Sequence, residues 1–299
     1  MQEKRKLLWS LMGDLPDRKI PVDVQTLKSE KIEGGTLELL QFKYPDEPAF
    51  QGYFVLPDGY AGNKVPAILY NHSHGSLFHL GKDELLQGVP YQNGPWLPDL
   101  LKAGYAVLTI DHRAFGSRSD RKIDDIFKEM LWRGQVLWGM MLYDSVRALD
   151  YLCSREEVDE ERIGTVGMSM GSTMAWYLAA VDERIKVCSD ICCMTDFEEL
   201  IKAEHLCGHG TYYFVPRLLK YFDTAAINAL IAPRPHISVN GMYDGLTPEA
   251  GLDKVDAALK TVYQNAGCPE LWKMIKYPVQ HQEVPEMRRE IMAFFRKYL

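Results

Sequence analysis

A serine within a tight glycine turn is the residue of this sequence whose surroundings best suit chemistry. Residues 166–172 read VGMSMGS, which places Ser169 in a Gly-x-Ser-x-Gly spacing. The apolar run 162–166 before it predicts a buried strand, and residues 172–180 after it predict a helix. A strand, this turn and a helix together expose a serine hydroxyl as a nucleophile. We therefore predict that Ser169 attacks an acyl carbon, although a glycine-rich turn with a buried serine has the same pattern.

An attacked carbonyl develops a negative oxygen, which two backbone N–H groups can stabilise. Met170 follows the serine and begins the expected helix, so its N–H has no acceptor within that helix. The second donor of such a site comes from the loop after an earlier strand. Here the strand expected at 66–70 runs into Asn-His-Ser-His-Gly at 71–75. We assign the N–H of His74 as the second donor, with Ser73 as the alternative.

A serine nucleophile also needs a base to take its proton. Four histidines follow Ser169 in the sequence: His205, His209, His236 and His281. Catalytic groups lie beyond the carboxyl ends of parallel strands, and His281 follows the strand expected at 271–277 within a few residues. His236 begins a strand instead, and the other two lie in a long insertion. The sequence therefore predicts His281 as the base.

The base in turn needs an acid that holds its ring, and the common order along the chain is serine, acid, histidine. Asp244 lies in a glycine-flanked loop after the strand expected at 236–240. Asp190 is the alternative, because it lies near the end of the strand expected at 185–191. We favour Asp244, since its loop lets a side chain turn inward toward the histidine.

Strands and helices must alternate to bring these residues together. From residue 66 onward they do, which predicts a mainly parallel sheet with helices on both faces. Residues 36–44 and 49–56 predict antiparallel edge strands joined by a turn at Pro45-Asp46. Helices are expected at residues 3–13, 96–103, 123–154, 248–266 and 283–298.

One connection is too long for a simple crossover. About 40 residues separate the strands at 185–191 and 236–240, so a cap-like insertion is expected at about 195–233. The chain then forms a single α/β domain, residues 1–299, with an N-terminal extension at about 1–21. The insertion holds three consecutive aromatic residues, which are Tyr212, Tyr213 and Phe214. We expect at least one of them to line the substrate pocket, the alternative being that they only anchor the insertion.

Composition excludes several classes of protein. The 299 residues are 46% hydrophobic, enough for a large core. A net charge of −7 without a basic run argues against a nucleic-acid partner. No apolar stretch approaches the ~20 residues that span a bilayer, and no signal peptide is evident. We expect a cytoplasmic protein with six free thiols, no cofactor and no metal, whereas its oligomeric state stays open.

These pieces resemble the α/β-hydrolase superfamily, in its dienelactone-hydrolase-like and acetyl-xylan-esterase-like branch. The resemblance runs from about residue 20 to the end and rests on the serine turn, the Asp244 and His281 loops, and the stretches 69–75, 111–119 and 231–235. It implies an α/β-hydrolase fold and a serine esterase that carries Ser169, Asp244 and His281. Ala114 and the pair Ser73-His74 depart from the pattern of relatives, and both touch the expected pocket.

Together these observations predict a serine hydrolase that cleaves a small acyl ester through an acyl-enzyme on Ser169. Peptidase or thioesterase action uses the same residues and stays open. A metal-dependent hydrolase is a second alternative, since His72 and His74 project from the same face of a strand end. A non-catalytic binding protein on the same scaffold is a third, because fold does not determine function.

Overall fold

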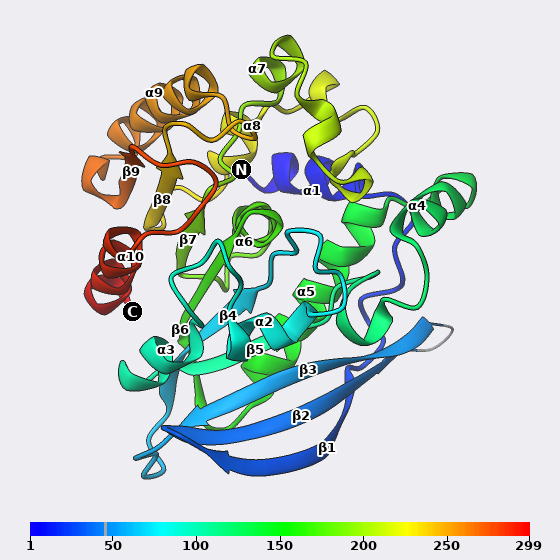
Figure 1. Ribbon diagram of the computed structural model, residues 1–299, viewed down its shortest axis with the longest axis vertical. Coiled ribbons are helices and arrows are strands. Elements are labelled where there is room, and N and C mark those ends of the chain that lie inside the picture. The colour runs from blue at the N-terminus through cyan, green and yellow to red at the C-terminus, as the bar shows by residue number, and fades with distance from the viewer. Residues whose placement is uncertain (45–46) are drawn as a thin grey trace.

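A nine-stranded sheet runs through the computed structural model, which describes residues 1–44 and 47–299 (Figure 1). The strands are β1 (Asp23–Ile32), β2 (Gly35–Tyr44), β3 (Glu47–Pro57), β4 (Val65–Asn71), β5 (Ala106–Ile110), β6 (Val158–Met168), β7 (Val187–Ile191), β8 (His236–Gly241) and β9 (Trp272–Tyr277). Their order is β1-β2-β3-β5-β4-β6-β7-β8-β9. The first three strands pair antiparallel, β3 also pairs antiparallel with β5, and all later pairs are parallel. The predicted α/β-hydrolase fold is confirmed.

The burial of each strand explains whether it could be predicted from the sequence. Every residue of β5 and β7 is buried, and each strand reads as a short apolar run, as expected for a sheet covered on both faces. β1 lies at the sheet edge with most of its residues exposed. Its polar sequence, with lysines that discourage edge-to-edge pairing, gave no hydrophobic signal, so the prediction missed this strand. The turn predicted at Pro45-Asp46 lies outside the described residues.

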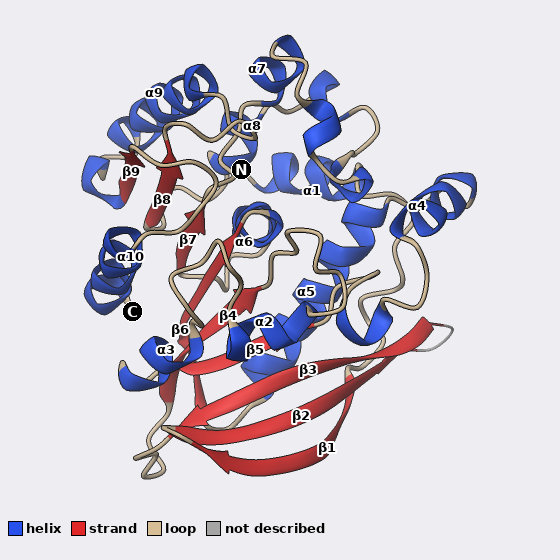
Figure 2. Ribbon diagram, viewed as in Figure 1, coloured by secondary structure: helices blue, strands red, loops and turns tan. Residues whose placement is uncertain are grey.

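Helices cover both faces of the sheet (Figure 2). They are α1 (Gln2–Ser10), α2 (Glu84–Gln87), α3 (Leu97–Lys102), α4 (Ile123–Trp132), α5 (Leu137–Ser154), α6 (Met170–Val181), α7 (Phe197–Lys202), α8 (Thr224–Asn228), α9 (Glu249–Asn265) and α10 (Pro285–Tyr298). One hydrophobic cluster joins α1, α5, α6 and α9 to the sheet, and a second joins α3 and α10 to it. Among the described residues, no helix is both long and apolar enough to cross a membrane.

The single helix predicted at 123–154 is wrong, because the chain breaks between α4 and α5. Gly134 adopts a left-handed backbone (φ +76°), which ends α4. The next residue, Gln135, forms a β-bridge with Gly13 of the N-terminal segment. The apolar periodicity continues through this break, so the pattern alone could not reveal it.

The connection between β7 and β8 has irregular structure, as its length suggested. It contains α7, α8 and three short 3₁₀ turns at Leu206–Gly208, Thr211–Tyr213 and Leu218–Lys220. Trp138 of α5 lies beneath it, with its ring 6.0 Å from that of Tyr212 and 6.2 Å from that of Tyr213. The segment 195–233 therefore packs through aromatic rings onto the helices that flank the sheet.

A buried arginine holds the segment between β9 and α10 in place. The Arg288 guanidinium donates to both carboxylate oxygens of Glu283 at 2.7 and 2.6 Å. It also donates to the backbone oxygens of Gly94 and Pro95, at 2.9 and 2.8 Å, and lies 4.1 Å from the Trp96 ring centre. Both charged side chains are buried, and Glu283 depends on Arg288 for neutralisation, whereas Arg288 has a second carboxylate partner in Asp99 at 3.0 Å.

We expect Arg288→Met to lower the free energy of unfolding by about 3–5 kcal/mol, because Glu283 would stay buried without its cation. Arg289→Met is the matched control, since Arg289 pairs with Glu286 on the exposed face of the same helix and should matter little. Urea unfolding of both variants measures the difference. Equal stabilities of the two variants would contradict the stabilising role of the Arg288–Glu283 pair.

Candidate active site

Ser169 lies at the junction of β6 and α6 in a strained backbone conformation. Its φ of +57° and ψ of −118° are disfavoured for a residue with a side chain. The chain around it is packed so closely that a Cβ on Gly171 would overlap the backbone oxygen of Asn71, and one on Gly167 would overlap Gly171. Glycine is therefore required at both positions. Met170 is the first residue of α6, which leaves its N–H without a helical acceptor.

The serine opens into a cavity of about 200 Å³. The cavity is lined by His74, Gly75, Ser76, Ser169, Met170, Thr173, Cys193, Gly208, His209, Gly210, Tyr212, Tyr213, Leu246 and His281. The structure thus brings most of the predicted site residues to one place. They come from β6–α6, from the loop after β4, from the segment 195–233 and from the loop after β9.

Asp244 and His281 form a close pair at this cavity. The two side chains are 2.7 Å apart, between His281 Nδ1 and Asp244 Oδ2. The other carboxylate oxygen accepts the N–H of Leu246 at 2.8 Å, so both oxygens of this buried acid have partners. The histidine is partly exposed and lines the cavity with its ring. The pairing matches the one predicted from the order of the residues along the chain.

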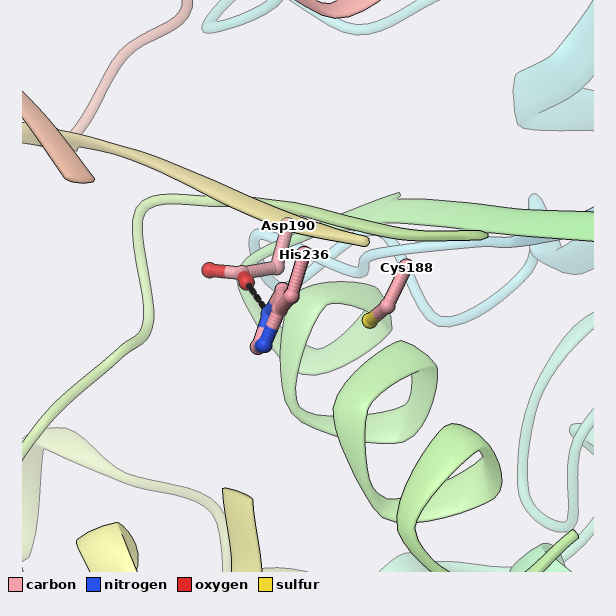
Figure 3. A group of neighbouring side chains, drawn as sticks. All are labelled: Cys188, Asp190 and His236. Carbon is pink, nitrogen blue, oxygen red and sulfur yellow. Dashed lines mark hydrogen bonds and ion pairs between the residues drawn. The ribbon is translucent and has the colours of Figure 1, made fainter. Parts of the chain in front are cut away.

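The alternative acid, Asp190, binds other side chains, away from the cavity. Its Oδ2 lies 2.7 Å from His236 Nε2, and its Oδ1 accepts the Ser238 hydroxyl at 2.7 Å. Figure 3 shows this pair with the Cys188 thiol beside α6, and all three side chains are fully buried. None of them lines the cavity of Ser169. The part of the chain that the structure describes therefore holds two Asp–His pairs, and of these two the Asp244 pair reaches the cavity.

The two histidines of the segment 195–233 bind the loop that carries Asp244. His205 Nδ1 lies 2.7 Å from the backbone oxygen of Gly245, and His209 Nε2 lies 3.0 Å from that of Leu246. Burial lowers the pKa of His209, so its ring stays neutral and donates to this oxygen. The sequence offered these residues as alternative bases. The structure uses them to tie the segment 195–233 to the Asp244 loop.

A buried carboxylate that the sequence prediction missed orders the loop after β4. Glu84 accepts the N–H of Ser73 at 3.0 Å to each oxygen, and it also accepts the Tyr70 hydroxyl and the Gln92 amide, at 2.6 and 2.8 Å. Because the Ser73 N–H is bound by Glu84, it is not free for a substrate. His74 is therefore the better candidate for the second oxyanion donor. Glu84 lies in a four-residue helix and carries no sequence signal.

The rings of His72 and His74 do not form a free pair of metal ligands. His72 Nδ1 lies 2.7 Å from the Ser73 oxygen, and its Nε2 accepts the N–H of His112 at 3.2 Å. His74 Nδ1 accepts the N–H of Ser76 at 3.0 Å, and its Nε2 lies 2.7 Å from the Tyr212 hydroxyl. All four ring nitrogens have protein partners. The metal-dependent alternative therefore has no support from these side chains.

The three consecutive aromatic residues of the segment 195–233 line two surfaces. Tyr212 and Tyr213 are buried and line the cavity. Phe214 is 36% exposed and lines a separate apolar groove of about 380 Å³ together with Leu206 and Leu218, and Tyr213 also contributes to that groove. Tyr212 and Tyr213 thus lie where a pocket residue was expected, whereas the expectation is wrong for Phe214, which does not line the cavity of Ser169.

Comparisons with known proteins identify a matching family and a similar sequence. Residues 66–232 match the model of a family described as "alpha/beta hydrolase fold". The protein YtaP of Bacillus subtilis (strain 168), whose name describes it as a candidate hydrolase, is 46% identical over 298 residues that cover 99% of each chain.

Two solved structures share the fold. A candidate acetyl xylan esterase from Bacteroides fragilis NCTC 9343 has a TM-score of 0.74 and 20% identity, covering 98% of this chain and 81% of its own. A glucuronoyl esterase from Solibacter usitatus has a TM-score of 0.68 and 18% identity, covering 99% and 91%. At these identities the likeness is one of fold.

The environment of His74 makes stability depend on pH. Burial lowers the pKa of His74 to about 4, with smaller effects from His72 and His281. In the unfolded chain this ring binds a proton below about pH 6.5, whereas in the folded protein it stays neutral down to about pH 4. The unfolded state therefore holds more protons between these values. Folding stability must fall as the pH falls through this window.

We expect the free energy of unfolding to drop between pH 6.5 and 4.5 by about 2 kcal/mol more in the wild type than in His74→Gln, which cannot titrate. Urea unfolding at several pH values measures both curves. The other buried histidines contribute equally to the two proteins and cancel. Parallel curves would contradict the neutral, buried state of His74.

Proposed function

The chain belongs to the α/β-hydrolase fold family, and on this premise we propose that it is a serine hydrolase that cleaves a carboxylic ester through an acyl-enzyme on Ser169. One observation carries the proposal. The strained serine and the Asp244-bound His281 line the same small cavity. A serine, a histidine and a buried acid in this relation make the machinery of acyl transfer.

The hydrogen bonds assign a role to each group. His281 Nδ1–H donates to Asp244, so the ring carries its proton there and offers Nε2 as a base. The base takes the Ser169 proton as the oxygen attacks the ester carbonyl, and then gives it to the leaving alcohol. The N–H groups of Met170 and His74 stabilise the oxyanion in both halves of the reaction. Water, activated by the same histidine, releases the acid and restores the serine.

Cavity size favours a small acyl group. About 200 Å³ has room for an acetyl or similarly short acyl group with part of its alcohol. Two proteins with this fold are described as a candidate acetyl xylan esterase and a glucuronoyl esterase. Acetylated sugars are therefore the first substrates to try, with thioesters and acyl peptides as the alternatives. The six free thiols suit a reducing compartment such as the cytoplasm.

We further propose that the segment 195–233 acts as a small cap on a single domain. It contributes Tyr212 and Tyr213 to the cavity wall, and its two histidines form hydrogen bonds with the loop that carries Asp244. Residues 1–21 then form an extension that packs against α6 through the Arg5 guanidinium, which donates to the backbone oxygen of Ala180 at 3.0 Å. A non-catalytic protein would have no need for the strained backbone at Ser169.

Ser169→Ala should lower ester turnover by about 10⁴-fold or more while the melting temperature stays near that of the wild type. The experiment screens acetylated sugars, short nitrophenyl esters, thioesters and acyl peptides with both proteins. The class of substrate that the wild type cleaves and the Ser169→Ala variant does not is the class on which Ser169 acts. Comparable turnover in the variant would exclude the serine mechanism.

Asp244→Asn should reduce kcat by about 10⁴-fold, because an amide can hold the wrong tautomer of His281 and cannot stabilise its charged form. Asp190→Asn is the control, since Asp190 binds His236 and Ser238 away from the cavity. It should lower stability and leave the kcat of the folded protein within a few-fold of the wild type. The opposite ranking of the two kcat values would transfer the role of the acid to Asp190.

A further inference from the structure

The side chain of His74 has a defined tautomer. Its Nδ1 accepts the N–H of Ser76 at 3.0 Å, so this nitrogen cannot carry a proton. Burial lowers the pKa of the ring to about 4, which keeps it neutral at ordinary pH. A neutral imidazole carries one proton, and here it must be on Nε2. Nε2–H therefore donates to the Tyr212 hydroxyl oxygen, 2.7 Å away.

This bond determines what the Tyr212 hydroxyl can do. Its oxygen accepts from His74, so its own proton has to point elsewhere. Within residues 1–44 and 47–299, the contact with His74 is the one hydrogen bond of this hydroxyl, so its proton has no protein acceptor there. Burial raises the pKa of Tyr212 well above its ordinary value, so the group stays protonated. The result is a buried O–H donor without an acceptor, in the wall of the cavity that holds Ser169.

An unsatisfied buried donor is costly, which points to an acceptor that the substrate supplies. The hydroxyl is tied to the side chain of the residue whose N–H is the second candidate oxyanion donor. Tyr212, His74 and His281 all line the cavity of Ser169, and His281, bound to Asp244, is the group proposed above to serve the leaving alcohol. The ring itself is fixed by its contacts with Trp138, Phe115 and His74.

We propose that the Tyr212 hydroxyl is a third donor to the carbonyl oxygen of the substrate, and that the His74 side chain is the positioning residue that aims it. The inference rests on the proposed ester hydrolysis. In the tetrahedral intermediate the donated hydrogen bond strengthens as negative charge gathers on that oxygen. No proton is transferred, and Tyr212 keeps its hydroxyl throughout both halves of the reaction.

The first test compares Tyr212→Phe with Tyr177→Phe. Both changes remove one buried hydroxyl and keep the ring, but Tyr177 lies on α6 and does not line the cavity. We expect Tyr212→Phe to lower kcat about 10- to 100-fold with KM within about threefold, and Tyr177→Phe to stay within about twofold. Melting temperatures show whether either variant is misfolded.

The second test separates the oxyanion from the leaving group. The kcat/KM of Tyr212→Phe, which reports acylation, should fall by the same factor on 4-nitrophenyl acetate and ethyl acetate, because both develop an oxyanion at the acetyl carbonyl while only the alkoxide of ethanol needs protonation. A loss confined to ethyl acetate would overturn the oxyanion role and make Tyr212 a helper of the leaving group.

A double-mutant cycle tests the role of His74. His74→Ala removes the donor to Tyr212, whereas His74→Gln keeps an N–H at a similar position. We expect His74→Ala to lower kcat, His74→Gln to recover most of it, and Tyr212→Phe with His74→Ala to lose little more than Tyr212→Phe alone. Additive losses would overturn the coupling. If Tyr212→Phe folds poorly, the kcat values of His74→Ala and His74→Gln still test whether the side chain of His74 matters.

The Ser169→Ala variant separates a failure of the proposed ester hydrolysis from a failure of the inference about Tyr212. Residual turnover in Ser169→Ala equal to that of the wild type would refute ester hydrolysis at this serine. An inactive Ser169→Ala with an unchanged Tyr212→Phe would refute only the inference about Tyr212.

Discussion

The close approach of α6 to the end of β4 is the constraint on which the site depends. Gly171 lies against the backbone of Asn71, and this contact holds the sharp turn in which Ser169 keeps a φ of +57°. Because Asn71 leads directly into the loop of His74, the same contact links the turn of Met170 to the loop of the second candidate oxyanion donor, and both residues line the cavity. A strained serine persists only where its surroundings leave the backbone no alternative, and here the sheet and the helix both enforce it.

Buried carboxylates then hold the loops that surround the serine. Glu84 binds the loop after β4, Asp244 binds the loop after β9 through His281, and Glu283 with Arg288 ties that loop to α10. Each acid has its oxygens satisfied, so the polar groups stabilise the loops instead of destabilising the core. Asp190 follows the same rule with His236 in the interior of the sheet. What separates the two Asp–His pairs is therefore their position in the sheet and not their chemistry.

Much of the fold and of the candidate site could be predicted from the sequence, because it follows from the local spacing of residues and from the order of the strands. The glycine turn at Ser169 and the pairing of Asp244 with His281 belong to that part. Glu84 was missed because its partners come together only in the folded chain. The same holds for β1, whose polar residues lie at a sheet edge, and for the break at Gly134, which depends on contact with the N-terminal segment. Phe214 was misplaced because spacing along the chain does not tell which of three consecutive rings lines the cavity, and this one lines the apolar groove.

The central claim is that Ser169 is a nucleophile activated by His281, and covalent labelling tests it most directly. A fluorophosphonate reacts with an activated serine and leaves an adduct that peptide mass spectrometry can locate. The account predicts one adduct per chain, on the peptide that contains Ser169, with a labelling rate that falls sharply in His281→Ala. Labelling at another residue, or an unchanged rate in His281→Ala, would contradict it.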